Sequence, residues 1–160
     1  MQPTSPPGLV ETVRDRADIL AVIALGGALG SLARYGVGEA LPHRPGEFPW
    51  STFVENVAGS FLLGVLMIVV LEVRPATRYL RPFLGVGVLG GFTTFSTAML
   101  DTHALAQEGV PLLLVAYLAG TVVSVLVAVA AAVALTRAAA GVGRGRRTHP
   151  GPPPHEPEIE

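Results

Sequence analysis

The sequence predicts an all-α membrane protein in which four transmembrane helices form one domain and the third helix is broken near its middle. Half of the 160 residues are hydrophobic, 14% are charged and the mean hydropathy is +0.53, which is too apolar for an ordinary soluble domain. Four apolar segments are long enough to cross a bilayer as helices. The third contains Gly90-Gly91 followed by four hydroxyl residues, a composition that weakens a helix.

The composition excludes several classes of function. The chain has no cysteine, so it offers no disulfide, thiolate metal site or cysteine nucleophile. All eleven basic residues are arginine, which excludes a P-loop or Schiff-base lysine, and the net charge of −1 gives no sign of a nucleic-acid partner. The four histidines lack ligand spacing. The spans also lack a nucleophile with its base or a pair of carboxylates, so we do not expect an enzyme.

The domain boundaries follow from the apolar pattern. Residues 1–18 are polar and lack the features of a signal peptide, which predicts a retained cytosolic tail. Residues 19–135 form the membrane domain, and the tail at 136–160 is rich in Gly, Arg and Pro and should be disordered in the cytosol. Pro111 suits the first position of the fourth helix. The four expected spans are 19–41, 51–71, 79–100 and 111–135.

The arginines predict the orientation of the chain in the plasma membrane. With four spans, both tails and the second loop lie on one side, which the positive-inside rule assigns to the cytoplasm. The opposite side has Arg44 and, at a helix end, Arg34. The cytoplasmic set is Arg14, Arg16, Arg74, Arg78, Arg81, Arg137, Arg144, Arg146 and Arg147.

Three polar side chains lie near the ends of the first two spans. Asn56 offers an amide that can donate to an anion without carrying charge, although such amides more often join two helices. Glu55 is either a proton-coupling carboxylate or, as we prefer, a residue of the headgroup zone beside Trp50. Arg34 either attracts anions to an entrance or snorkels as an anchor.

The third span also carries a row of hydroxyls. Thr93 shares a helical face with Ser96 and Thr97, which places uncharged donors in line unless they bond back to the preceding turn. Phe95 either packs as an apolar ring or presents its positive edge to an anion. Tyr117 adds a hydroxyl to the otherwise apolar fourth span.

Three motifs occur in order, with spans of suitable length between them. They are Gly26-Gly27-Ala28-Leu29-Gly30 with Arg34 in the first span, Thr52-Phe53-Val54-Glu55-Asn56-Val57-Ala58-Gly59-Ser60-Phe61 in the second, and Gly90-Gly91-Phe92-Thr93-Thr94-Phe95-Ser96-Thr97 in the third. Together they resemble the Fluc (CrcB) family of fluoride channels, and the resemblance covers residues 21–135.

The resemblance implies a fluoride-selective channel that exports fluoride passively and so relieves its toxicity. The expected assembly is an antiparallel dimer with two narrow pores and a structural sodium ion at its centre, held by the carbonyls of Gly90 and Thr93. Neutral donors can replace the water around fluoride without trapping it as a cation would. By motif position, Arg34 would lie at the entrance, and the pore residues would be Asn56, Phe95, Ser96, Thr97, Tyr117 and Thr121.

Two features depart from the family pattern. The motif usually has a second phenylalanine three residues after Phe95, where this chain has Ala98. An antiparallel homodimer also requires one chain to insert both ways, whereas these arginines favour one orientation. We therefore expect the partner to be a paralogous subunit of opposite orientation.

Two alternatives stay open. A small proton-coupled multidrug transporter also uses four short helices in an antiparallel dimer, but it needs a glutamate in its first span, and residues 19–37 contain no acidic residue. A non-conducting partner subunit of a heterodimeric channel is the other alternative, and Ala98 makes it harder to exclude.

Overall fold

The computed structural model describes residues 16–73 and 78–141, and every regular element in these two ranges is a helix. Four helical segments are long and apolar enough to cross a membrane: Ala17–Ala40, Trp50–Val73, Pro82–Gln107 and Pro111–Ala140. Within the described residues, the prediction of an all-α fold with four helices long and apolar enough to span a membrane is therefore confirmed. The expected tails lie mostly in residues 1–15 and 142–160, outside the described ranges.

The first and last spans are each one continuous helix, whereas the second and third are composite. The second span ends in a short π-helix and the third begins with one. In chain order the elements are α2 (Ala17–Ala40), α3 (Trp50–Ile68), η1 (Val69–Val73), η2 (Pro82–Leu89), α4 (Gly90–Phe92), α5 (Phe95–Gln107) and α6 (Pro111–Ala140).

The helices of the third and fourth spans extend beyond the predicted apolar segments. Helix α5 ends at Gln107 rather than at residue 100, because its polar last turns stay helical beyond the apolar stretch. Helix α6 starts at Pro111 as predicted but ends at Ala140 rather than at residue 135. Its last residues are alanines, which favour helix strongly, and Gly141 at φ 67° supplies the left-handed cap.

Helix α2 packs on η2 and α4 through glycines. A β-carbon added at Gly30 would overlap the carbonyl oxygen of Val88, and one at Gly91 would lie 2.5 Å from the carbonyl oxygen of Gly27. Only residues without side chains let two helix backbones come this close. The glycines of α2 and of the third span therefore form a close packing contact.

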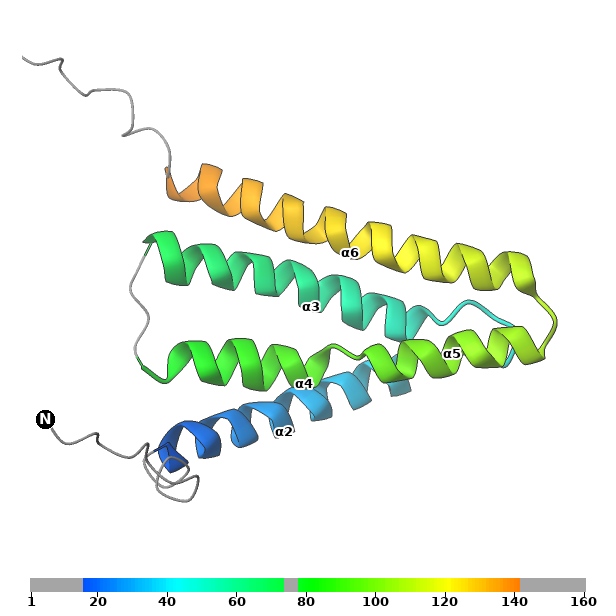
Figure 1. Cartoon of the computed structure of the whole chain (residues 1–160), viewed down its shortest axis with the longest axis horizontal. Coiled ribbons are helices and arrows are strands. Elements are labelled where there is room, and N and C mark those ends of the chain that lie inside the picture. The colour runs from blue at the N-terminus through cyan, green and yellow to red at the C-terminus, as the bar shows by residue number, and fades with distance from the viewer. Residues whose placement is uncertain (1–15, 74–77, 142–160) are drawn as a thin grey trace, which may run out of the picture.

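The other close pair of helices is α3 with α6. In Figure 1, α6, α3 and the α4–α5 segment follow one another from top to bottom, and α2 crosses α4 below them. The start of α2 and the end of α6 lie at the same end of the bundle. A chain with four spans returns to the side on which it started, which accounts for this arrangement.

Polar contacts hold the spans together at that end. Asp18 of α2 accepts hydrogen bonds from Arg78 Nη2 at 3.3 Å and from the Tyr79 hydroxyl at 2.7 Å. Arg137 of α6 donates through Nε to Glu72 Oε2 at 3.0 Å. These pairs connect the first span to the third and the second to the fourth.

Candidate functional site

The third span is interrupted at Thr93 and Thr94, which separate α4 from α5. Their backbone is extended, with φ −78° and ψ 153° at Thr93 and φ −148° and ψ 125° at Thr94. The Thr94 hydroxyl caps α5, since its Oγ1 accepts from the Thr97 N–H at 3.2 Å. We call Thr93 and Thr94 the interruption.

Asn56 of α3 bonds to both backbone groups of Thr94. Its Nδ2 donates to the Thr94 carbonyl at 2.9 Å and its Oδ1 accepts from the Thr94 N–H at 2.8 Å. Unpaired backbone groups inside a bilayer have no water to bond. The Asn56 amide therefore replaces the backbone hydrogen-bond partners that Thr94 would have in a continuous helix. An amide has two donor hydrogens, and only one is needed for the Thr94 carbonyl. Asn56 therefore joins two spans and retains one donor.

The interruption leaves two carbonyls without their α-helical donors. In a continuous helix the Gly90 carbonyl accepts from the N–H of Thr94, and the Thr93 carbonyl accepts from that of Thr97. Here these N–H groups donate to Asn56 Oδ1 and Thr94 Oγ1 instead. The Thr93 carbonyl has a long contact of 3.5 Å from Arg34 Nη1. Both carbonyls can thus accept from a ligand.

A cavity of about 350 Å³ lies beside the interruption between the third and fourth spans. Three of the predicted pore residues, Asn56, Phe95 and Thr121, line it together. The Thr121 hydroxyl is buried and has no hydrogen-bond partner among the described residues, so it can bind a ligand in the cavity. We call this the interruption cavity. Its lining residues are Asn56, Ser60, Thr93, Thr94, Phe95, Ala98, Met99, Leu118, Thr121, Val122, Val125 and Leu126.

The remaining hydroxyls predicted as a ladder do not share one surface. Thr93 Oγ1 donates back to the Leu89 carbonyl at 3.0 Å, as most membrane threonines do. Ser96 is exposed, whereas Thr97 is half-buried with its Oγ1 3.0 Å from that of Thr94. Phe95 is 77% exposed, so its ring faces outward from the isolated chain as well as onto the cavity.

A second, more polar cavity of about 300 Å³ lies on the other side of Thr97, between α2 and α3. Arg34 lines it and also reaches the interruption, which joins the predicted entrance residue to the site. We call it the Glu55 cavity. Its lining residues are Ser31, Arg34, Tyr35, Gly38, Glu39, His43, Ser51, Thr52, Glu55 and Thr97.

Glu55, which we expected in the headgroup zone beside Trp50, is buried within the chain. Its side chain is only 3% exposed, and it faces the interior with Ser51, Thr52 and Gly59. Ser51, Thr52 and Gly59 each lie three or four positions from Glu55, so they share one face of α3 with it. Trp50, in contrast, is exposed. The sequence also gave no reason to single out His43, which reaches the same cavity from the loop before α3.

Tyr117 lies away from the interruption cavity. Its side chain is fully buried in a cluster with Ala98 and Leu105, and its hydroxyl donates to Asp101 Oδ2 at 3.4 Å. Phe48 packs on its ring edge-to-face, with the centroids 5.5 Å apart. In the isolated chain Tyr117 thus binds α6 to α5.

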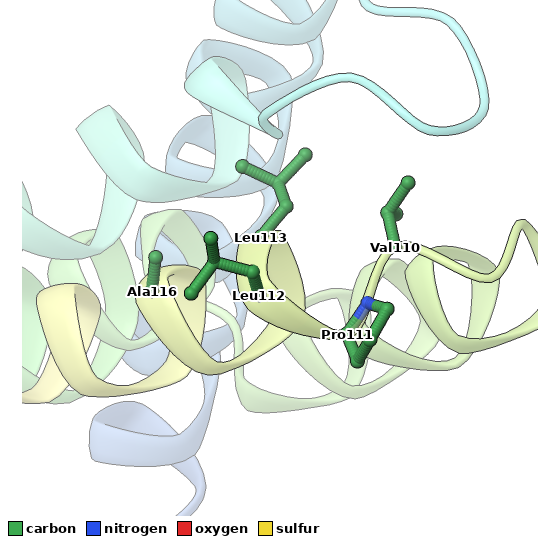
Figure 2. Close-up of a pocket in the computed structure, with 5 residues that line it drawn as sticks. All are labelled: Val110, Pro111, Leu112, Leu113 and Ala116. Atoms are coloured by element: carbon green, nitrogen blue, oxygen red, sulfur yellow. The ribbon is translucent and has the colours of Figure 1, made fainter.

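A shallow hollow lies at the start of α6. It has a volume of about 510 Å³ and is lined by Val110, Pro111, Leu112, Leu113 and Ala116 (Figure 2). These side chains are all apolar and offer no donor to an ion. The two polar cavities are therefore the candidate site.

A comparison with protein families identifies one match. The model described as "CrcB-like protein, Camphor Resistance (CrcB)" matches residues 21–133, which include all four spans except their outermost turns. The interruption and both polar cavities lie within the matched residues.

Curated relatives carry a consistent name. "Fluoride-specific ion channel FluC 2" of Nocardia farcinica is 53% identical over 108 residues, which cover 68% of this chain and 77% of that protein. FluC 2 of Streptomyces avermitilis is 50% identical over 106 residues, covering 66% of this chain and 67% of the relative. FluC 3 of the same organism is 54% identical over 96 residues, covering 60% of this chain and 47% of the relative.

Proposed function

The chain belongs to the CrcB-like family, and from that premise we propose that it is a subunit of a fluoride-selective channel that exports fluoride passively. The observation that carries the proposal is the interruption cavity, which presents an amide and hydroxyl groups but no charged side chain. A small, strongly hydrated anion needs donors that replace its water, and a cation in the pore would trap it. Uncharged donors can replace the water around the anion and still allow it to leave.

The proposed pore residues are Asn56, Phe95, Ser96, Thr97, Tyr117 and Thr121. Support is strongest for Asn56 and Thr121, because the amide has a donor to spare and the Thr121 hydroxyl has no partner among the described residues. Phe95 lines the same cavity. Arg34 is proposed at the entrance, since it lines the Glu55 cavity and reaches Thr93.

We assign the structural sodium ion to the carbonyls of Gly90 and Thr93. Their fit rests on the hydrogen bonds described above, which divert the helical donors of these two carbonyls. Carbonyl oxygens are suitable ligands for a hard cation. A bound sodium ion would supply positive charge where two subunits meet.

The working unit is proposed to be an antiparallel dimer with two pores, in which the interruption breaks the third membrane helix near its middle. The exposed ring of Phe95 supports this assembly, because a partner subunit would cover it and complete the wall of a pore. Large apolar side chains are exposed along every span, and lipid and a second subunit would cover them.

The second subunit is proposed to be a paralogue, with both termini of this chain in the cytoplasm. The arginine bias favours one orientation, so the opposite one needs another chain. Streptomyces avermitilis has both a FluC 2 and a FluC 3, which shows that paralogues coexist in that organism. Ala98 supports an unequal contribution to the two pores.

Fluoride efflux from liposomes tests both proposals. The chain is reconstituted alone and together with a co-purified paralogue, and efflux is followed with a fluoride electrode, with chloride efflux as the control. We expect fluoride but not chloride to leave when both subunits are present. Equal fluxes of the two anions would overturn the selectivity. Full activity of the chain alone would overturn the heterodimer.

A further inference from the structure

Glu55 is an isolated carboxyl group inside a membrane-spanning helix. Its side chain is 3% exposed, and it has no hydrogen bond or ion pair with any described residue. It lines the Glu55 cavity, which holds one guanidinium, that of Arg34. An ionised carboxylate without a partner in such a place is costly, and a bound proton removes that cost.

Titratable groups surround Glu55 on several sides. Helix α2 contributes Arg34, Tyr35 and Glu39, and the loop before α3 contributes His43. From α5, Asp101 lies beside the cavity with its Oδ1 3.7 Å from His43 Nε2, while its Oδ2 accepts from Tyr117 of α6. Helix α4 contributes only two glycines and a phenylalanine. Carboxylates therefore outnumber the guanidinium.

Two contacts connect the lining of the Glu55 cavity to the interruption. Thr97 lines this cavity, and its N–H bonds to Thr94, which lines the interruption cavity. Arg34 spans the same gap, since it lines the Glu55 cavity and its Nη1 lies 3.5 Å from the Thr93 carbonyl. An anion that moves toward Asn56 by this route passes Arg34 and Glu55 together.

We infer that Glu55 is a proton-operated gate at this mouth of the pore. When Glu55 is ionised, it offsets the charge of Arg34 and repels an incoming anion. When Glu55 takes up a proton, the Arg34 charge is available to attract fluoride. The inference rests on the proposed fluoride channel function and adds to it that fluoride flux increases as the pH falls.

The test uses the full chain, reconstituted with its partner where one is needed, with the same pH on both sides of the vesicle. Efflux is compared at about pH 6 and about pH 8. Protein-free vesicles at each pH give the leak of hydrogen fluoride, which is subtracted. We expect roughly tenfold faster efflux at the lower pH.

Two variants separate Glu55 from the other groups. Glu55→Gln keeps the size and removes the charge, so its efflux should be fast at both pH values. Glu108→Gln makes the same change at an exposed residue that lies at the same end of the helix bundle but does not line the Glu55 cavity. This variant should keep the wild-type pH dependence. Infrared difference spectra between the two pH values should contain a protonated-carboxyl band that Glu55→Gln lacks.

The outcomes are distinguishable. Fluoride efflux by the wild type that does not change with pH would overturn the gate and leave the channel function standing. A pH dependence that persists in Glu55→Gln would assign the gate to another group, such as His43, and would also overturn the inference. Absence of fluoride efflux at every pH, with or without a partner, would instead overturn the proposed function.

Discussion

Asn56 and Thr94 are joined by two hydrogen bonds, of 2.8 Å and 2.9 Å, between a side-chain amide and a backbone N–H and carbonyl. This pairing replaces the helical bonds that the third span lacks at the interruption. It makes Asn56 both a support for the backbone of the proposed pore and a donor within it. A substitution there therefore affects stability and flux together.

Asn56→Asp should abolish most fluoride efflux. The carboxylate can still accept from the Thr94 N–H, but it cannot donate to the carbonyl and it repels an anion. Loss of one buried hydrogen bond should also lower the free energy of unfolding in detergent by about 1–3 kcal/mol. Electrode-monitored efflux and thermal unfolding provide the two measurements. Leu63→Ala, on the exposed side of α3, is the control and should leave efflux unchanged.

Thr94→Ala should weaken the start of α5. The change removes the hydroxyl that caps the helix, at a cost of about 1 kcal/mol. Thr94→Ser keeps an oxygen in place and should restore most of the stability. The melting temperatures of the two variants in the same detergent give the comparison. Equal melting temperatures would show that the Thr94–Thr97 contact does not stabilise α5.

Gly30→Ala should separate α2 from η2. The added methyl group would overlap the Val88 carbonyl, which is backbone and cannot turn aside. Overpacking of this kind costs roughly 1–3 kcal/mol. Gly36→Ala is the matched control, since nothing lies within 4 Å of the new β-carbon, and it should be neutral or stabilising. If both variants unfold at the same temperature, the close contact is not a source of stability.

Tyr117→Phe and Thr121→Val distinguish the two polar residues of α6. Removal of the Tyr117 hydroxyl takes away its bond to Asp101 and should lower stability by about 1 kcal/mol, with a small effect on efflux. Thr121→Val removes an unpartnered hydroxyl from the interruption cavity, so it should reduce efflux with little loss of stability. The reverse pattern would give Tyr117 rather than Thr121 the larger role in the proposed pore.

Features that depend on composition and local spacing could be predicted from the sequence. The four spans follow from long apolar runs, and the packing face of α2 follows from Gly26 and Gly30, whose missing side chains are visible in the sequence. Pro111 marks the start of α6 because proline suits only the first turn of a helix.

Features that depend on which helix faces which could not be predicted in this way. Neighbouring residues point in directions about 100° apart on a helix. Glu55 and Asn56 therefore face different cavities, although their sequence positions suggest a common place. For Tyr117 the sequence shows a hydroxyl, but its partner Asp101 lies on another helix. The π-helix η2 has no local sequence signal that we identify.

The two halves of the third span have different neighbours. Its first half, η2 and α4, packs mainly on α2, whereas α5 has more contact with α6. Thr93 and Thr94 therefore connect two helical segments that pack on different neighbours. Asn56 of α3 stabilises this connection through its hydrogen bonds to Thr94. Any shift of α2 against α6 would therefore act on Thr93 and Thr94, which connect the two halves of the span.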